Sequence, residues 1–324
     1  MYRYTIKRVL LIFPTLLGAA ALVFFLLRII PGDICELRHG GLEGNSIDED
    51  AIQVCRMDAG LDQSRLVQFG DFIGDFVVFD LGRSMWTGRK ITHELGLRFK
   101  LTIQVAVMAI VISVLIGLPL GIFAAVRQDS WLDYAVRAFS VAGIAIPSFW
   151  LGIMIILGLL VSTQNLLGDP WMPPIEYVSP LKDPIGNMVQ LIWPAVATGY
   201  RFSAGVTRMT RSALLEVLRE DYIRTARSKG LIEKIVINRH GLKNSMLPVA
   251  TIIGMEFAAL MSGLIVTEQV FNLNGIGKLF VESVQLHDHA MTQSLVMLFA
   301  LIFILTNFVI DIFYAWLDPR IRYS

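Results

Sequence analysis

"LTIQVAVMAIVISVLIGLPLGIFAAV", residues 101–126, is the stretch that decides the fold class of this protein. It contains no charged residue, and almost all of its side chains are apolar. A transmembrane helix needs about 20 predominantly apolar residues to cross about 30 Å of hydrocarbon. This stretch is therefore expected to cross a membrane as one helix.

Five other segments have the length and apolar character of a membrane-spanning helix. They are residues 9–30, 138–161, 188–209, 248–268 and 292–317. The segment 188–209 is the least apolar, because it contains Pro194 and Arg201. The segment 9–30 follows a basic start, as a signal peptide does, but it is too long for one and we expect a retained helix. The sequence predicts an all-α polytopic membrane protein with six transmembrane helices.

The composition agrees with this fold class. Hydrophobic residues make up 55% of the 324 residues, and the mean hydropathy is +0.61. Charged residues make up 17%, whereas soluble domains usually carry about 25%. The net charge of +1 gives no indication of a nucleic-acid partner.

Lysine and arginine in the connections predict the orientation of the helices. Residues 208–243 contain nine of them, whereas 162–187 and 269–291 contain one each. Both termini are also basic. Because short cytoplasmic loops carry the excess of positive charge, we expect both termini and residues 208–243 to be cytoplasmic.

Residues 31–100 then form an external segment between a first region, 1–30, and a core of five membrane helices, 101–324. Within this segment, residues 65–85 are expected to form a short amphipathic helix and a turn. Cys35 and Cys55 both lie here. They are either two separate small residues or a disulfide, which would close a loop of about 20 residues and contribute about 3 kcal/mol in an oxidising compartment.

The polar connection after the fourth membrane segment begins with helical spacing. In "ALLEVLREDYIRTARSKG", residues 213–230, an apolar stripe is formed by Leu215, Leu218, Tyr222 and Ala226. Gly230 stands where a left-handed residue would end this helix. A second amphipathic piece, 231–240, is expected to end at Gly241, and Pro248 is suited to begin the fifth membrane helix.

Periodicity alone leaves two interpretations of this connection open. It is either an interfacial helix on anionic lipid, attracted by about 1 kcal/mol per basic residue, or a helix that fits a groove on a cytoplasmic partner. In both cases we expect two short helices that present an apolar ridge with a basic rim.

Two stretches of this connection carry a family resemblance. "YIRTARSKGL" (222–231) followed by "RHGLKNSMLP" (239–248) resembles the cytoplasmic signature loop of the inner-membrane subunits of ABC importers, and more narrowly the dipeptide/oligopeptide/nickel permease family. The general signature is Glu-Ala-Ala, three residues, Gly, and later Ile-x-Leu-Pro. Here its places are taken by Arg224, Thr225, Ala226, Gly230 and Leu247–Pro248. The Arg and the longer spacing after the glycine depart from the general signature and are typical of the peptide-permease branch.

Further stretches resemble landmarks of the same family, in the same order along nearly the whole chain. They are "RIIPGD", "GLDQSRLVQF", "DLGRS", "RMTRSALLEVLREDYIRTARSKG", "TEQVFNLNGIGKL" and "DPRIRY". The resemblance implies a multi-pass inner-membrane permease subunit of an ATP-driven importer for peptides or related small solutes. The substrate itself stays open between a di- or oligopeptide, a nickel chelate, an opine and a sugar.

The resemblance also implies partners and a site. The partners are a second homologous permease subunit that forms the other half of the pathway, two cytoplasmic ATP-binding subunits and an external solute-binding protein. The loop at about 210–247 would dock on an ATPase, through Glu220, Asp221, Tyr222, Arg224, Thr225, Ala226, Lys229, Gly230 and Leu231.

Two motifs are interpreted as non-functional matches. "NGIGKLF" (274–280) resembles the end of a phosphate-binding loop, but Asn272 and Leu279 replace the required Gly and Ser/Thr. We therefore expect no cofactor in this chain and an energy source on a partner. "LHDH" (286–289) is interpreted as a solvated external loop, so no metal site is predicted. With no catalytic motif either, the chain is not expected to be an enzyme.

Glu256 lies in the middle of the fifth membrane segment. A charge at that depth costs about 3 kcal/mol, so Glu256 should face the helix bundle or a water-filled path. It either lines the pathway or makes an interhelical hydrogen bond, and Arg201 is a candidate counter-charge. An alternative function is an ion-gradient-driven secondary transporter with Glu256 as its proton site.

Overall fold

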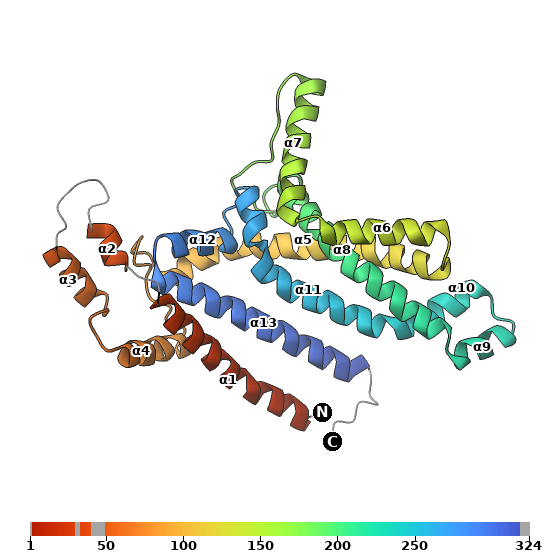
Figure 1. Ribbon diagram of the computed structural model, residues 1–324, viewed down its shortest axis with the longest axis horizontal. Helices are drawn as coiled ribbons and strands as arrows, with labels where there is room; N and C mark the ends of the chain where they lie inside the picture. The colour runs from red at the N-terminus through yellow and green to blue at the C-terminus, as the bar shows by residue number, and fades with distance from the viewer. Residues whose placement is uncertain (1, 30–32, 40–48, 318–324) are drawn as a thin grey trace. The chain divides into compact units, whose positions relative to one another are not determined.

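The structure, a computed structural model, describes residues 2–29, 33–39 and 49–317 (Figure 1). In these ranges the chain is helical, and its only β-type pairing is an isolated bridge between Arg83 and Lys90. The basic C-terminal stretch "DPRIRY" lies outside the described residues. The chain forms two compact units. The first comprises Met1–Lys100 and Gly275–Leu305, and the second mainly Leu101–Asn274.

Five helices in the described ranges are long and apolar enough to cross a membrane. Their apolar spans are Arg8–Leu27, Ile91–Val126, Ser148–Leu167, Glu233–Met261 and His289–Ile312. The helices that contain them are α1 (Tyr2–Leu27), α5 (Ile91–Val126), α7 (Ser148–Leu167), α10 (Glu233–Ile235) with η1 (Val236–Leu242) and α11 (Lys243–Val270), and α13 (His289–Leu317). The predicted all-α polytopic membrane fold is confirmed.

The prediction of one unbroken helix over 138–161 is wrong. Helix α6 (Trp131–Ala145) ends there, and α7 begins at Ser148. Between them, Ile146 is extended with φ −82° and ψ 120°. The cause is Pro147, because a proline lacks the N–H of a helical hydrogen bond and keeps the preceding residue out of the helical region. The apolar span at this place is α7.

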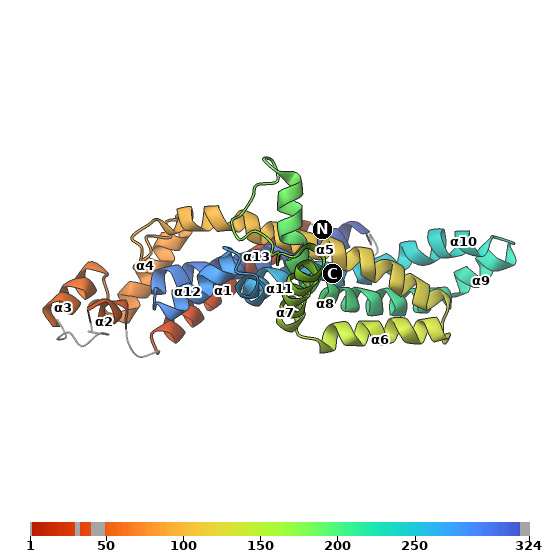
Figure 2. The same ribbon diagram turned by 90° about the horizontal axis from the view of Figure 1, so that it is seen from above.

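The fourth predicted span lies in α8 (Pro184–Leu218), which is long but is not among the five apolar helices. Its polar side chains are largely buried against other helices: Thr198, for example, lies 3.1 Å from Thr267 of α11, oxygen to oxygen. Helix α8 also packs on α6 and α7, and it runs beside α6 in both views (Figures 1 and 2). A helix covered by protein needs less apolar surface than one in lipid, which explains the low hydropathy of this segment.

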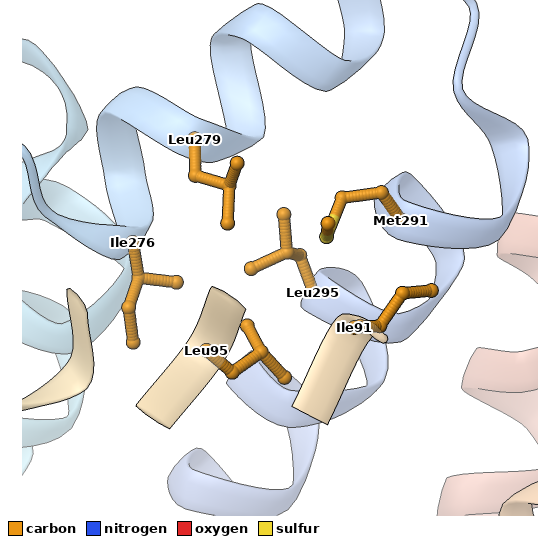
Figure 3. Packing of buried hydrophobic residues seen from close by; sticks show 6 residues of the cluster. All are labelled: Ile91, Leu95, Ile276, Leu279, Met291 and Leu295. Carbon is orange, nitrogen blue, oxygen red and sulfur yellow. The ribbon is translucent and has the colours of Figure 1, made fainter. Parts of the chain in front are cut away.

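The first unit has its own apolar core, drawn in Figure 3. Ile91 and Leu95 of α5 pack there with residues of α12 (Ile276–Gln285) and the first turns of α13, namely Ile276, Leu279, Met291 and Leu295. The short helix α12 was not expected from the sequence.

The external segment contains α2 (Ile34–His39), α3 (Glu49–Asp58) and α4 (Arg65–Val77). Helix α4 and the turn after it agree with the amphipathic helix and turn expected over 65–85. Phe69 of α4 packs on Phe24 of α1, with ring centroids 5.2 Å apart. Cys35 and Cys55 form a disulfide that joins α2 to α3, with their Cα atoms 5.7 Å apart.

Candidate functional site

The polar connection begins with a break that the sequence analysis missed. Helix α8 ends at Leu218, and α9 (Asp221–Ser228) starts afresh after Glu220, whose backbone is extended. The prediction of one helix over 213–230 is therefore wrong at this point. A signal was present: Glu220 and Asp221 are adjacent acidic residues, which are favoured at a helix N-terminus by the helix dipole.

The break changes which side chains the connection buries. Ile223 and Ala226 of α9 pack with Val236 of η1 and with Leu218. Tyr222, which was expected on the buried stripe, is 41% exposed, and its hydroxyl accepts a hydrogen bond of 2.8 Å from the Asn244 side chain. Leu218 and Ala226 thus share the buried side as expected, whereas Tyr222 lies on the outer side.

Gly230 ends α9 as predicted. It has φ +76°, in the left-handed region that favours glycine. The Gly230 N–H donates to the Arg227 carbonyl at 3.0 Å, and the Leu231 N–H donates to the Ala226 carbonyl at 3.4 Å. These two bonds form a Schellman motif, which satisfies carbonyls that a helix end leaves without partners.

The second half of the connection is continuous with the fifth membrane helix. Helix α10 leads into the π-helical turns of η1 and then into α11, so the predicted end at Gly241 and start at Pro248 are both wrong. Gly241 packs under Leu214, and Pro248 lies inside α11. Prolines are tolerated within membrane helices because neighbouring groups re-satisfy the freed carbonyl.

An ion pair joins the two helices across Gly230. The Arg227 guanidinium donates to both oxygens of Glu233, at 2.7 and 3.1 Å. Bidentate pairs of this kind fix orientation as well as adding energy. The pair and the apolar contacts of Ile223 give this connection a defined shape. We call residues 219–241 the coupling loop, after the role that the sequence predicts for them.

The outer surface of the coupling loop combines apolar and charged side chains. Tyr222 is exposed, as are Ile232 (70%) and Ile235 (41%). The predicted docking residues Glu220, Asp221, Arg224, Thr225, Lys229, Gly230 and Leu231 are all exposed as well, and Ala226 is buried. Exposed apolar residues rimmed by polar ones are typical of interaction surfaces.

A buried ion pair anchors the base of the loop. Both oxygens of Asp133 in α6 accept hydrogen bonds of 2.7 Å from the Arg211 guanidinium in α8. Asp133 has no exposed surface, and the hydrogen bond from Arg211 holds the pKa of that carboxyl below its ordinary value. Sequence analysis missed this pair, which joins residues 78 positions apart. A groove of about 510 Å³ lies beside it, lined by Arg211, Glu216, Arg219, Glu220 and Asp221 among others.

Glu256 of α11 faces α8 at Gly205. A Cβ atom added at Gly205 would come too close to the Glu256 Oε1 atom, so any other residue there would require the carboxylate to move. The Glu256 Oε2 atom is buried and has no hydrogen-bond partner among the described residues. The charge that acts on Glu256 is that of Arg208, and no contact with Arg201 is found in the described part of the chain.

Arg201 and Arg208 nevertheless lie on the same face of α8 as Gly205, since they stand four residues before it and three residues after it. Both side chains are exposed. Charged side chains at membrane depth face a helix bundle or a water-filled cavity, not lipid. This face is therefore suited to line a polar path or to meet another subunit.

The interpretation of 286–289 as a solvated loop is wrong. Asp288 is 3% exposed and accepts a hydrogen bond of 2.5 Å from the Ser84 hydroxyl. Its other oxygen accepts from the Met291 N–H at 3.1 Å, so Asp288 caps the start of α13. This segment is a structural link to the external segment.

Three comparisons place these features among known proteins. Residues 117–323 match the family described as "Binding-protein-dependent transport system inner membrane component". The chain is 38% identical to the glutathione transport system permease protein GsiC of Escherichia coli O6:H1 and 37% identical to that of Pectobacterium atrosepticum, over 324 residues and the full length of each protein.

Solved structures are similar in fold. An amino acid ABC transporter chain matches with a TM-score of 0.54 at 12% identity, covering 69% of this chain and 94% of that one. A chain of the inward-facing MetNI methionine ABC transporter also has a TM-score of 0.54, at 16% identity, with 69% and 96% covered.

Proposed function

The chain belongs to the family of binding-protein-dependent transport system inner membrane components, and from this premise we propose that its coupling loop transmits the action of separate ATP-binding subunits to the membrane helices. The chain is a multi-pass permease subunit of an ATP-driven importer in the inner membrane. Family membership speaks against the alternative of an ion-gradient-driven transporter that uses Glu256 as a proton site.

The observation that carries the proposal is the exposed and internally packed form of the coupling loop. Tyr222, Ile232 and Ile235 project from a loop whose interior is held by Ile223, and whose two helices are joined by the Arg227–Glu233 pair. An apolar projection surrounded by charged residues is suited to a groove on a partner protein. Its apolar contacts contribute affinity, and its charges fix the orientation of the two proteins.

Because α10, η1 and α11 are continuous, a movement of the coupling loop can be transmitted to the membrane-spanning part of α11. The helix runs from Glu233 to Val270 and carries Glu256 on its way. A displacement of the loop can therefore pass along one continuous helical element to the Glu256–Gly205 contact. A break at Gly241 or Pro248, as the sequence suggested, would have absorbed that displacement.

The partners follow from the family and from what the chain lacks. No phosphate-binding loop is present in the sequence, so ATP hydrolysis takes place on other subunits, two in number, and the chain itself carries no cofactor. A second homologous permease subunit forms the other half of the path, and an external binding protein delivers the solute. The coupling loop lies on the cytoplasmic side, as its excess of basic residues indicates.

The substrate is a short peptide. Full-length relatives at 37–38% identity are named for glutathione transport, which makes glutathione the first peptide to test. Glu256, with Arg201 and Arg208 on the facing helix, lines the polar path through which it passes.

The test is ATP-dependent uptake of labelled glutathione into proteoliposomes that contain the complete transporter. Reversing two exposed charges of the coupling loop, Arg224→Glu with Lys229→Glu, is expected to reduce uptake at least ten-fold while the chain still inserts. Lys90→Glu with Lys182→Glu, two exposed positions outside the loop that do not line the cavity of the first unit, is the matched control. Normal uptake with normal ATP turnover in the loop variant would refute the docking role.

A further inference from the structure

The first unit contains a cavity of about 960 Å³ that the proposed coupling does not use. Small-molecule sites typically have about 300–1,000 Å³ and a few well-placed polar groups between apolar walls. The walls here come from the end of α1, from α2 and α3, from residues 83–85 and from the first turns of α13. Ile34, Val54 and Met85 form the apolar part.

Two residues of the cavity lining, Arg28 and Gln293, carry hydrogen-bond donors. The Arg28 guanidinium is held in place by two hydrogen bonds to the Gln68 side-chain oxygen, at 2.8 and 3.1 Å, and it stacks on the Phe24 ring. Gln293 is 5% exposed and lines the same cavity. Its Nε2 atom is buried and has no hydrogen-bond partner among the described residues.

A buried donor without a partner is costly, so nearly all such groups in proteins are satisfied. Gln293 lines the cavity, so a rotation of its side chain would bring this donor to an acceptor that binds there. Because Arg28 lines the same space and has no ion pair within the described residues, the preferred acceptor is an anion such as a carboxylate.

The part of the lining that comes from α3 carries negative charge. Asp50, Val54 and Asp58 follow one another at four-residue spacing and so lie on one face of α3. Neither aspartate forms an ion pair with a described residue, although Arg28 and Arg83 line the same cavity. The disulfide between Cys35 and Cys55 fixes this wall to α2.

We propose that this cavity is an external binding site for a short peptide with a free carboxylate and a free amino group. The carboxylate accepts hydrogen bonds from Arg28 and Gln293, and the ammonium group lies against Asp50 and Asp58. Arg28 and the two aspartates line one cavity but form no ion pair with each other, so they can bind the carboxylate and the ammonium group of a zwitterion. This inference rests on the proposed function for the peptide class, and on the cavity for the mode of binding.

Binding of glutathione to the full chain in lipid nanodiscs, with no other subunit present, tests the proposal. Glutathione should bind saturably. Its N-acetyl derivative, which lacks the ammonium charge, and its diethyl ester, which lacks the carboxylate charges, should each bind at least ten-fold more weakly. The variant Asp58→Asn should weaken glutathione binding but bind the N-acetyl derivative as the unaltered chain does. Gln293→Leu should weaken binding of all three compounds.

Asp62→Asn, an exposed aspartate that does not line the cavity, is the matched control and should change nothing. Thermal unfolding shows whether the Gln293→Leu variant remains folded. Asp58 is exposed, so the Asp58→Asn variant tests the proposal without changing a buried residue. Absence of saturable binding, or equal binding by Asp58→Asn and the unaltered chain, overturns the inference. The proposed function is separately judged by ATP-dependent uptake, which needs no binding to the isolated chain.

Discussion

At the scale of single residues, two glycines allow local arrangements that a side chain would disturb. Gly230 supplies a left-handed backbone between α9 and α10, and Gly205 supplies the space for the Glu256 carboxylate. The first was recognisable in the sequence because helix ends follow a local pattern. The second was not, because it depends on a side chain from another helix.

Gly230→Ala is expected to destabilise the coupling loop by about 1–2 kcal/mol, through backbone strain alone. A Cβ atom at this position would meet nothing within 4 Å. ATP-driven uptake should fall while the amount of inserted protein stays constant. Gly168→Ala is the control, since it has φ +82° and equally open space but ends α7, and its uptake should remain near normal.

Gly205→Ala is expected to displace the Glu256 carboxylate and to lower the uptake rate several-fold. The added methyl group would come too close to the Glu256 Oε1 atom, so this carboxylate would have to move. Gly158→Ala, in α7 with open space around it, should leave uptake unchanged. If both variants transport at the normal rate, the place of Glu256 opposite Gly205 has no part in transport.

At the scale of elements, one buried charge pair links α6 to α8. Asp133→Asn leaves the Arg211 guanidinium without its carboxylate, and loss of a partner in a buried pair costs about 3–5 kcal/mol. We expect a marked fall in the free energy of unfolding in detergent. Asp169→Asn, at an exposed position, should change it by less than about 0.5 kcal/mol.

The same pair predicts a pH dependence. Arg211 holds the pKa of Asp133 below its ordinary value of 3.8. Between the folded and unfolded pKa values the unfolded chain binds more protons, so stability rises with pH in that window. The contribution of the pair is thus complete above about pH 4 and is lost as the pH falls through the folded value. Thermal unfolding of Asp133→Asn should lack this acid-induced loss.

Element boundaries were the least predictable feature. Pro147 ends a helix as its chemistry suggests, yet Pro194 and Pro248 lie inside α8 and α11. The difference is that the latter two belong to long helices packed against neighbours. Local propensity is a weak guide where tertiary packing satisfies the freed backbone groups.

At the scale of the whole molecule, the external segment is held together by covalent and polar links. The disulfide joins α2 to α3, and the Ser84 hydroxyl donates a hydrogen bond to Asp288, 204 residues away along the chain. Such links suit a segment with a small apolar core, since a small core alone supplies little stability.

Replacement of both cysteines, Cys35→Ser with Cys55→Ser, should therefore weaken the external segment by about 3 kcal/mol, the loop-closure value for about 20 residues. Limited proteolysis from the external side should become faster for the variant. A reductant should accelerate cleavage of the unaltered chain to the same rate and have no effect on the variant. Equal rates for all four samples would contradict a stabilising role.

The sequence by itself determined the membrane fold, the family and the site of the coupling loop. These depend on runs of apolar residues, on basic residues in short connections and on a local motif around Gly230, all of which are properties of neighbouring residues. Only the tertiary structure decided that Tyr222 faces outward, that α10 continues into α11, and that Glu256 meets Gly205. It also brought together the Arg28, Gln293 and α3 side chains around one cavity. Such contacts join residues that are distant along the chain, and their free energy depends on how whole helices pack rather than on the order of residues in any one of them.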